Sequence, residues 1–240
     1  MKKRTFALVL SAVLCIGLIP NAYAGTTLNM EGGSPKLEYE DPNPLPPPPG
    51  SVEDEPIGEG PVEIPVNNPF DDVRPDDFFY DAVLWAAEQG IIGGSGSFGP
   101  NEVCSRAETV YLLWRAAGSP QPDDSASPFT DVRPGDYFYD AVLWAVEQGI
   151  ASGTSGAGFS PNATVNRAQA VTFLFRAVKA QDTGGGSAFA DVPANAYYAG
   201  PVRWAVSQGI ASGTSADTFG PDLNCTRAHI VTFLYRAQGQ

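Results

Sequence analysis

Apolar residues recur every three or four positions in three stretches of the chain. Tyr139, Val142, Val146 and Ile150 fall on one face of a helix with 3.6 residues per turn. Gly149 follows the last turn, where a residue in the left-handed conformation commonly ends a helix. The same spacing is found in residues 80–91 and 199–210. The pattern therefore predicts three amphipathic helices of similar length.

These stretches belong to an internal repeat. "PFDDVRPDDFFYDAVLWAAEQGI" (69–91) returns as "PFTDVRPGDYFYDAVLWAVEQGI" (128–150) and more loosely as "AFADVPANAYYAGPVRWAVSQGI" (188–210). Each copy continues with a Gly/Ser-rich loop, a Phe-x-Pro turn and a second apolar helix that starts with "CSRAET", "VNRAQA" or "CTRAHI". Ser105 with Glu108, and Asn166 with Gln169, have the spacing of a capping box. One such unit cannot bury its apolar faces alone, so three helix–loop–helix units are predicted to pack around a shared axis in a mainly α fold.

The N-terminal 24 residues have the features of a secretory signal peptide. Three basic residues precede an apolar run from Phe6 to Ile19, and an Ala-x-Ala sequence ends at Ala24. The run is too short to cross a bilayer. We therefore expect cleavage after Ala24, export, and no membrane insertion of the mature chain.

Between the signal peptide and the repeats, the composition changes. Half of the 22 prolines lie in residues 35–69, interleaved with acidic residues. Proline removes hydrogen-bond donors and like charges repel, so residues 25–68 are predicted to be an acidic, disordered linker. The repeats then occupy residues 69–119, 126–180 and 186–240. The whole chain has 27 Asp and Glu against 14 Lys and Arg, a net charge of −13 that argues against nucleic acid as a partner.

The motifs that recur in every copy resemble those of a known family. "FxDV", then a helix ending in "WAxxxGI", then "GxxxxxFxPxxxxxRA", is similar to the S-layer homology domain of bacterial envelope proteins. The resemblance implies a pseudo-threefold spindle with a central helical bundle, in a monomer. It implies non-covalent anchoring at the bacterial cell wall, in the S-layer, rather than enzyme activity, and no cofactor. The implied partner is a secondary cell-wall polysaccharide, often bearing pyruvate ketals on N-acetylmannosamine, held in grooves between repeats.

Cysteine and histidine chemistry is disfavoured by comparing the copies. Cys104 and Cys225 stand where the second copy has Val165, and His229 stands where it has Gln169. Residues that exchange for valine and glutamine are poor candidates for a nucleophile, its base or a metal ligand. Two cysteines at matching positions of an exported chain leave a Cys104–Cys225 disulfide open.

The arginine that starts each second helix is the stronger candidate for function. These residues are Arg106, Arg167 and Arg227. One interpretation is a fork that binds a ligand carboxylate at a helix N-terminus. The other is an ion pair with the aspartates of "FxDV", which are Asp72, Asp131 and Asp191. The resemblance implies that the arginines and their polar neighbours, Ser105, Asn166 and Thr226, contribute to the polysaccharide grooves.

Other residues leave alternatives open. Three tryptophans could stack on sugars or pack in the core: Trp85, Trp144 and Trp204. Because the third copy has His229 in place of an acid and Pro201 inside its first helix, we expect its groove to be weak. A structural or adhesive surface protein, acting by lateral packing or through its acidic linker, is the main alternative function. A secreted hydrolase is the weaker one, since the repeats offer no acid–base pair.

Overall fold

The computed structural model describes residues 68–182, 184–186 and 188–238. The predicted signal peptide and all but the last residue of the predicted linker lie outside this part. The described residues belong to one unit with six α-helices and no named β-strand, which confirms the mainly α prediction. The helices are α1 (Tyr80–Glu88), α2 (Arg106–Ala116), α3 (Tyr139–Glu147), α4 (Arg167–Ala177), α5 (Ala199–Ser207) and α6 (Arg227–Gln238).

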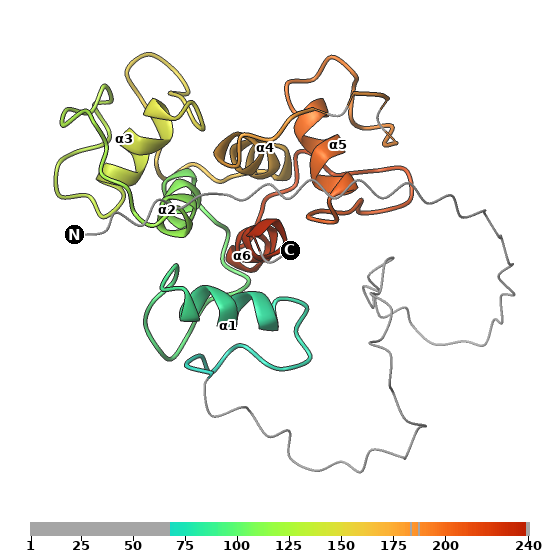
Figure 1. The fold of residues 1–240 in the computed structure, drawn as a ribbon, viewed down its shortest axis with the longest axis horizontal. Coiled ribbons are helices and arrows are strands. Elements are labelled where there is room, and N and C mark those ends of the chain that lie inside the picture. The colour runs from blue at the N-terminus through green and yellow to red at the C-terminus, as the bar shows by residue number, and fades with distance from the viewer. Residues whose placement is uncertain (1–67, 183, 187, 239–240) are drawn as a thin grey trace, which may run out of the picture. The chain divides into compact units, whose positions relative to one another are not determined.

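The second helices of the repeats form the centre of this unit. Helices α2, α4 and α6 pack against one another, and Figure 1 shows them surrounded by α1, α3 and α5. Helix α3 packs on α2, α5 on α4, and α1 on α6. Each outer helix therefore covers the central helix of the preceding repeat, and the first repeat closes the ring by packing on the last. The predicted bundle is confirmed. Each outer helix packs on the central helix of a neighbouring repeat, and not on that of its own repeat.

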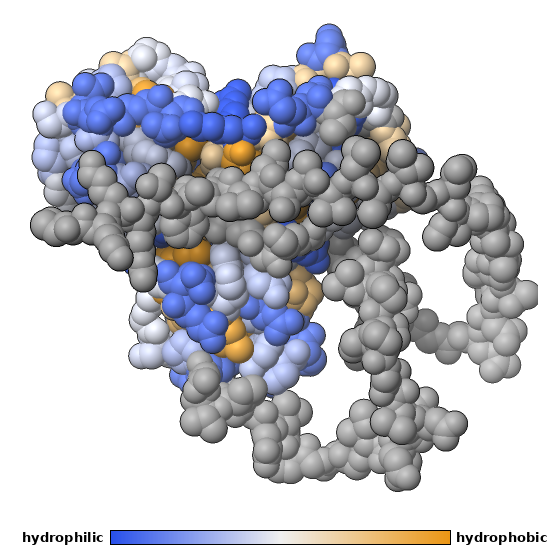
Figure 2. Space-filling model, viewed as in Figure 1, coloured by the Kyte–Doolittle hydropathy of each residue, from blue (hydrophilic) through white to orange (hydrophobic). Residues whose placement is uncertain are grey.

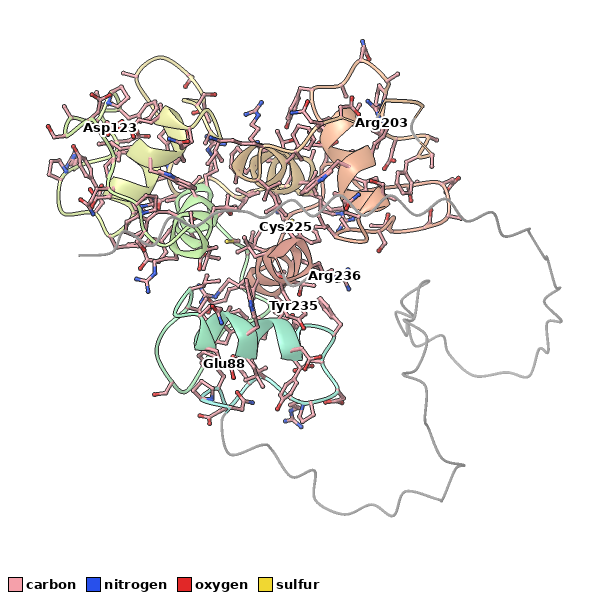
Figure 3. The ribbon with its side chains drawn as sticks, in the orientation of Figure 1. Glu88, Asp123, Arg203, Cys225, Tyr235 and Arg236 are labelled. Atoms are coloured by element: carbon pink, nitrogen blue, oxygen red, sulfur yellow. The ribbon has the colours of Figure 1, made fainter. Side chains whose placement is uncertain are left out.

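A ring of backbone hydrogen bonds holds the three repeats together at the axis. The Cys104 N–H donates to the Cys225 carbonyl (2.9 Å), Cys225 N–H to the Val165 carbonyl (2.8 Å), and Val165 N–H to the Cys104 carbonyl (3.1 Å). All three side chains are fully buried, and Figure 3 shows Cys225 in the middle of the unit. Small apolar side chains suit this enclosed position because they leave no polar group buried without a partner.

A glycine at the end of α3 and a proline at the start of α5 both suit the helix ends at which they lie. Gly149 has a φ of +68°, and the next residue, Ile150, donates its N–H to the Ala145 carbonyl at 2.8 Å. This left-handed end confirms the role predicted for the glycine. Pro201 lies in the first turn of α5. The N–H groups of a first turn have no intrahelical partner, so the proline removes no helical hydrogen bond.

The central helices differ in how their first turns are capped. In α4, Asn166 and Gln169 bond reciprocally, through side chain to backbone in both directions, and form a complete capping box. In α2, Ser105 accepts from the Glu108 N–H at 3.1 Å, but the Glu108 carboxylate pairs with Arg227 of α6 instead of returning to the cap. The capping box expected in the first copy is thus half formed, because the carboxylate binds a cation.

The "FxDV" aspartates fasten the loops that lead to the central helices. Asp131 accepts the N–H groups of Phe159 and Ser160, both at 2.8 Å. Asp72 and Asp191 make the same pair of bonds in their own repeats. Partial burial alone would raise the pKa of Asp131, but the two N–H donors outweigh it and hold the pKa below its ordinary value of 3.8.

We expect Asp131→Ala to lower the free energy of unfolding by about 1–2 kcal/mol at neutral pH, after allowance for solvent screening. A carboxyl with a lowered folded-state pKa contributes stability above its unfolded-state pKa. That contribution is lost as the pH falls through the folded-state value. Urea unfolding at pH 7 and near pH 2.5 should show the difference between variant and wild type narrowing in acid. A difference that stayed constant across this range would contradict the assignment.

The outer surfaces of the three lobes are mostly hydrophilic on the face shown in Figure 2, and hydrophobic residues lie nearer the middle. Among the described residues, no helix has both the length and the apolar character needed to span a membrane.

Candidate ligand-binding groove

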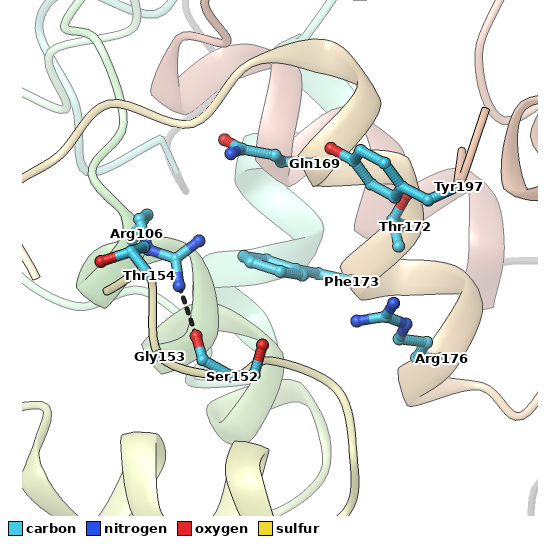
Figure 4. Close-up of a pocket in the computed structure, with 9 residues that line it drawn as sticks. All are labelled: Arg106, Ser152, Gly153, Thr154, Gln169, Thr172, Phe173, Arg176 and Tyr197. Carbon is cyan, nitrogen blue, oxygen red and sulfur yellow. Dashed lines mark hydrogen bonds between the residues drawn. The ribbon is translucent and has the colours of Figure 1, made fainter. Parts of the chain in front are cut away.

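A pocket of about 220 Å³ opens where the repeats meet. It lies between the start of α2, the flank of α4, the loop after α3 and the segment before α5 (Figure 4). All three repeats contribute to its wall, and the lining residues are Arg106, Ser152, Gly153, Thr154, Gln169, Thr172, Phe173, Arg176 and Tyr197.

Arg106 is the most buried cation of the pocket, with 5 % of its surface exposed. Its Nε donates to the Phe159 carbonyl at 3.1 Å, and its Nη2 donates to the Ser152 carbonyl at 2.9 Å. The guanidinium carbon lies 4.8 Å from the ring centre of Phe159 and 5.4 Å from that of Phe173. Burial lowers the pKa of Arg106, but arginine starts so far above neutral pH that it remains charged. Neutral groups therefore hold this cation in a fixed orientation.

The charge of the pocket is not balanced by a carboxylate. Arg176 donates from Nη1 to the Ile150 carbonyl at 3.1 Å, beyond the end of α3. Within the described ranges, neither Arg106 nor Arg176 forms an ion pair. A buried cation without an anion is costly, and an unbalanced one in a cleft is typical of a site that receives a negatively charged group.

The remaining wall supplies neutral donors and an aromatic surface. Gln169 accepts the Asn166 N–H through Oε1 at 3.2 Å, so its Nε2 amide hydrogens remain for a ligand. Tyr197 stands at the rim with 60 % of its surface exposed. Together these groups can bind a carboxylate through the cations and amide, and can pack a sugar ring against the tyrosine. No His, Cys, Asp or Glu side chain is among the residues that line the pocket.

The structure places the arginines predicted from sequence at three different junctions between the central helices. Arg106 lines the pocket, whereas Arg167 and Arg227 start the other two central helices. The Nε of Arg167 donates to the Phe219 carbonyl at 3.0 Å, and that of Arg227 donates to the Phe98 carbonyl at 2.9 Å. An ion pair with the "FxDV" aspartates was the other interpretation, but Arg106 bonds to two carbonyls and Arg227 pairs with Glu108 instead. Each aspartate binds the N–H of the same phenylalanine whose carbonyl accepts the arginine, so the backbone of that phenylalanine lies between them.

The other predicted site residues lie outside the pocket lining. Ser105, Asn166 and Thr226 occupy the cap positions of α2, α4 and α6 and bond to their first turns. Trp144 and Trp204 are buried in the core. Trp85 is half-buried, and its ring centre lies 5.5 Å from that of Tyr235 across the contact between α1 and α6. These placements favour packing over sugar stacking for the tryptophans.

Of the nine residues that line the pocket, only Arg106 was predicted as a site residue from the sequence. A sequence signal was present for two of the others, Arg176 and Tyr197. Arg176 follows Arg167 by nine positions, and the other two copies keep the same second arginine. Tyr197 is the first residue of an aromatic pair that precedes every outer helix. A helix-end arginine can also bond to carbonyl groups, as Arg176 does to that of Ile150, so the sequence alone does not distinguish the two roles.

In the described part of the chain, Cys104 and Cys225 are free and buried. Their backbones are neighbours, as the open disulfide interpretation required, but the structure has no bond between them. Burial raises the pKa of Cys104 to about 11 and that of Cys225 to about 12. No group of three or more His, Cys, Asp or Glu side chains in the described part could hold a metal ion.

We expect both thiols to resist alkylation by iodoacetamide at pH 8 in the native protein and to react fully in denaturant without reductant. Only the thiolate reacts, and burial suppresses it. The protein used is the chain without residues 1–24, which removes Cys15. Intact-mass measurement of this protein, denatured and unreduced, should show two added groups. A protein that gained none until reductant was added would instead contain a disulfide.

Comparison with known proteins agrees with the repeat pattern. The model of the S-layer homology domain matches residues 69–110, 128–171 and 188–230, more than half of the chain. An S-layer protein of Bacillus thuringiensis subsp. finitimus is 28 % identical over 177 residues, covering 71 % of this chain and 21 % of that protein. A surface-layer 125 kDa protein of Lysinibacillus sphaericus is 33 % identical over 101 residues, 42 % of this chain and 8 % of that one. An amylopullulanase of Thermoanaerobacterium thermosulfurigenes is 26 % identical over 174 residues, 69 % and 9 % respectively. The chain thus spans about a fifth, or less, of these relatives.

Proposed function

This chain belongs to the S-layer homology domain family, and on that basis we propose that it is a non-catalytic anchor that binds a cell-wall polysaccharide in a groove between its repeats. The family and its surface-layer relatives indicate a protein associated with the cell surface and cell wall. The polysaccharide we propose carries carboxylate groups, such as pyruvate ketals on its sugars.

The unbalanced charge around Arg106 is the observation that carries this proposal. The guanidinium is fixed by two carbonyls and two aromatic rings, and Arg176 adds a second positive charge to the same pocket. A carboxylate ligand would complete the site, and the Gln169 amide would favour its orientation. Because the chain as a whole is acidic, with a net charge of −13, these local contacts must overcome a repulsive long-range field.

Binding to purified cell wall tests the proposal. We expect the protein to sediment with intact wall and to remain in solution after the non-peptidoglycan polymer has been extracted. Adding the extracted polymer back as a competitor should release protein from intact wall. Undiminished binding to the stripped wall would contradict polysaccharide recognition, because peptidoglycan would then be the ligand.

A further inference from the structure

The three central helices meet pairwise at three junctions, which we call grooves; they are built alike but carry different charges. In each, the arginine that starts one central helix faces the third residue of a neighbouring central helix. Arg106 and Gln169 line the pocket together, and Arg227 pairs with Glu108. In the remaining groove, His229 lies close enough to Arg167 for that cation to help lower its pKa, after the larger effect of burial. One position therefore presents an amide, an imidazole or a carboxylate to the arginine.

Glu108 neutralises the arginine of the groove between α2 and α6. Its Oε1 pairs with Arg227, and its Oε2 accepts from the Cys104 thiol at 3.4 Å. The side chains of Arg227 and Glu108 are 25 % and 17 % exposed, so the pair is partly shielded from solvent. An anionic ligand that approached Arg227 would meet the negative charge of Glu108, whereas one that approached Arg106 would meet the donors of Gln169.

The same groove also contains a larger side chain. Tyr111 occupies the helical position that Thr172 occupies in the pocket. Its ring makes an edge contact with Tyr137 at 5.2 Å between ring centres, and the Arg115 guanidinium lies 6.0 Å from its centre. Tyr137 and Arg115 correspond to Tyr197 and Arg176, which face the open volume in Figure 4. The tyrosine thus occupies space that the threonine leaves to a ligand.

We propose that Glu108 and Tyr111 close the groove between α2 and α6 to acidic sugars, while Gln169 and Thr172 keep the groove between α2 and α4 open. Two residues per groove then determine which of the related grooves binds. The inference rests on the proposed polysaccharide function and adds to it the identity of the residues that select the site.

Exchanging these residues tests the proposal. The probe is the methyl glycoside of pyruvylated N-acetylmannosamine, with the unpyruvylated glycoside as control, titrated calorimetrically into the full chain. Glu108→Gln combined with Tyr111→Thr should raise the number of bound probes by one per protein. The reciprocal Gln169→Glu should weaken binding at the pocket at least tenfold, because the new carboxylate would pair with Arg106 as Glu108 does with Arg227. Gln169→Ala, which removes the amide without adding a charge, should weaken binding less.

The outcomes separate this inference from the function on which it rests. If the wild-type protein binds the probe and the folded double variant binds the same number, the selection by Glu108 and Tyr111 is wrong while the proposed function stands. If Gln169→Glu and Gln169→Ala weaken binding equally, the charge at this position does not select the groove. If neither the wild type nor any variant binds pyruvylated probe, the proposed function fails and the inference fails with it. Circular dichroism melts of each variant identify any that does not fold, and the Gln169 pair then carries the test.

Discussion

Replacing Arg106 with alanine should weaken binding of the acidic wall polysaccharide by about 10- to 100-fold, because a hydrogen bond to a charged group contributes about 1.5–3 kcal/mol. The residue is oriented by the Phe159 and Ser152 carbonyls before a ligand arrives, so little side-chain entropy is lost on binding. Arg106→Lys keeps the charge but loses the planar fork, and we expect an intermediate loss. Calorimetric titration of each variant with purified polysaccharide measures the effect.

Arg227→Ala is the matched control for this experiment. It removes an arginine from the same helical position, but one whose charge is already neutralised by Glu108. We expect this variant to bind within about threefold of the wild type, well below the tenfold step that 1.4 kcal/mol represents. If Arg106→Ala and Arg227→Ala weakened polysaccharide binding equally, the proposed difference in charge between the two grooves would be contradicted. Thermal melts must accompany both, since each arginine also bonds to a loop carbonyl.

Phe159→Ala should lower the free energy of unfolding by about 3–5 kcal/mol, the usual cost of removing a buried aromatic side chain. Phe159 is fully buried, and its ring centre lies 5.4 Å from that of Phe129. The same residue receives Arg106 over its ring and binds Asp131 through its N–H. The substitution should therefore loosen the pocket as well as the core, and urea unfolding with parallel binding measurements would detect both.

Phe159→Leu is the companion variant for stability. It keeps an apolar side chain and leaves a smaller cavity, so we expect a smaller loss of unfolding free energy than with alanine. Polysaccharide binding should fall for both variants, because the aromatic face beneath Arg106 is lost in each. A decrease of less than about 1 kcal/mol for Phe159→Ala would show that the site collapses around the deletion and that the ring is not a main support of the repeat.

Local features of the fold could be read directly from the sequence. Apolar spacing located the helices, and Gly149 marked the end of α3. The exchange of Cys104 for Val165 between copies argued against cysteine chemistry, and both side chains are fully buried in the structure. These features depend on neighbours within one or two helical turns, where the physical rules for caps and amphipathic faces apply.

Contacts between repeats could not be predicted in this way. Nothing in the sequence of α1 indicates that it covers α6 rather than α2 of its own repeat. The partner of Glu108 is Arg227, more than a hundred positions away, and the choice between that cation and the local cap depends on three-dimensional proximity. The same limit explains why the arginines looked equivalent in sequence. Their surroundings come from different repeats, and only the assembled bundle reveals which charge is balanced.

The central claim is that an acidic sugar binds in the pocket between α2 and α4. A titration of ¹⁵N-labelled protein with the methyl glycoside of pyruvylated N-acetylmannosamine, followed by amide NMR shifts, tests it most directly. The account predicts the largest shifts for the amides of residues 152–154, Gln169 and Tyr197, with little change around Glu108 and Arg227. Shifts centred on the groove between α2 and α6, or shifts that the unpyruvylated glycoside reproduces, would contradict it.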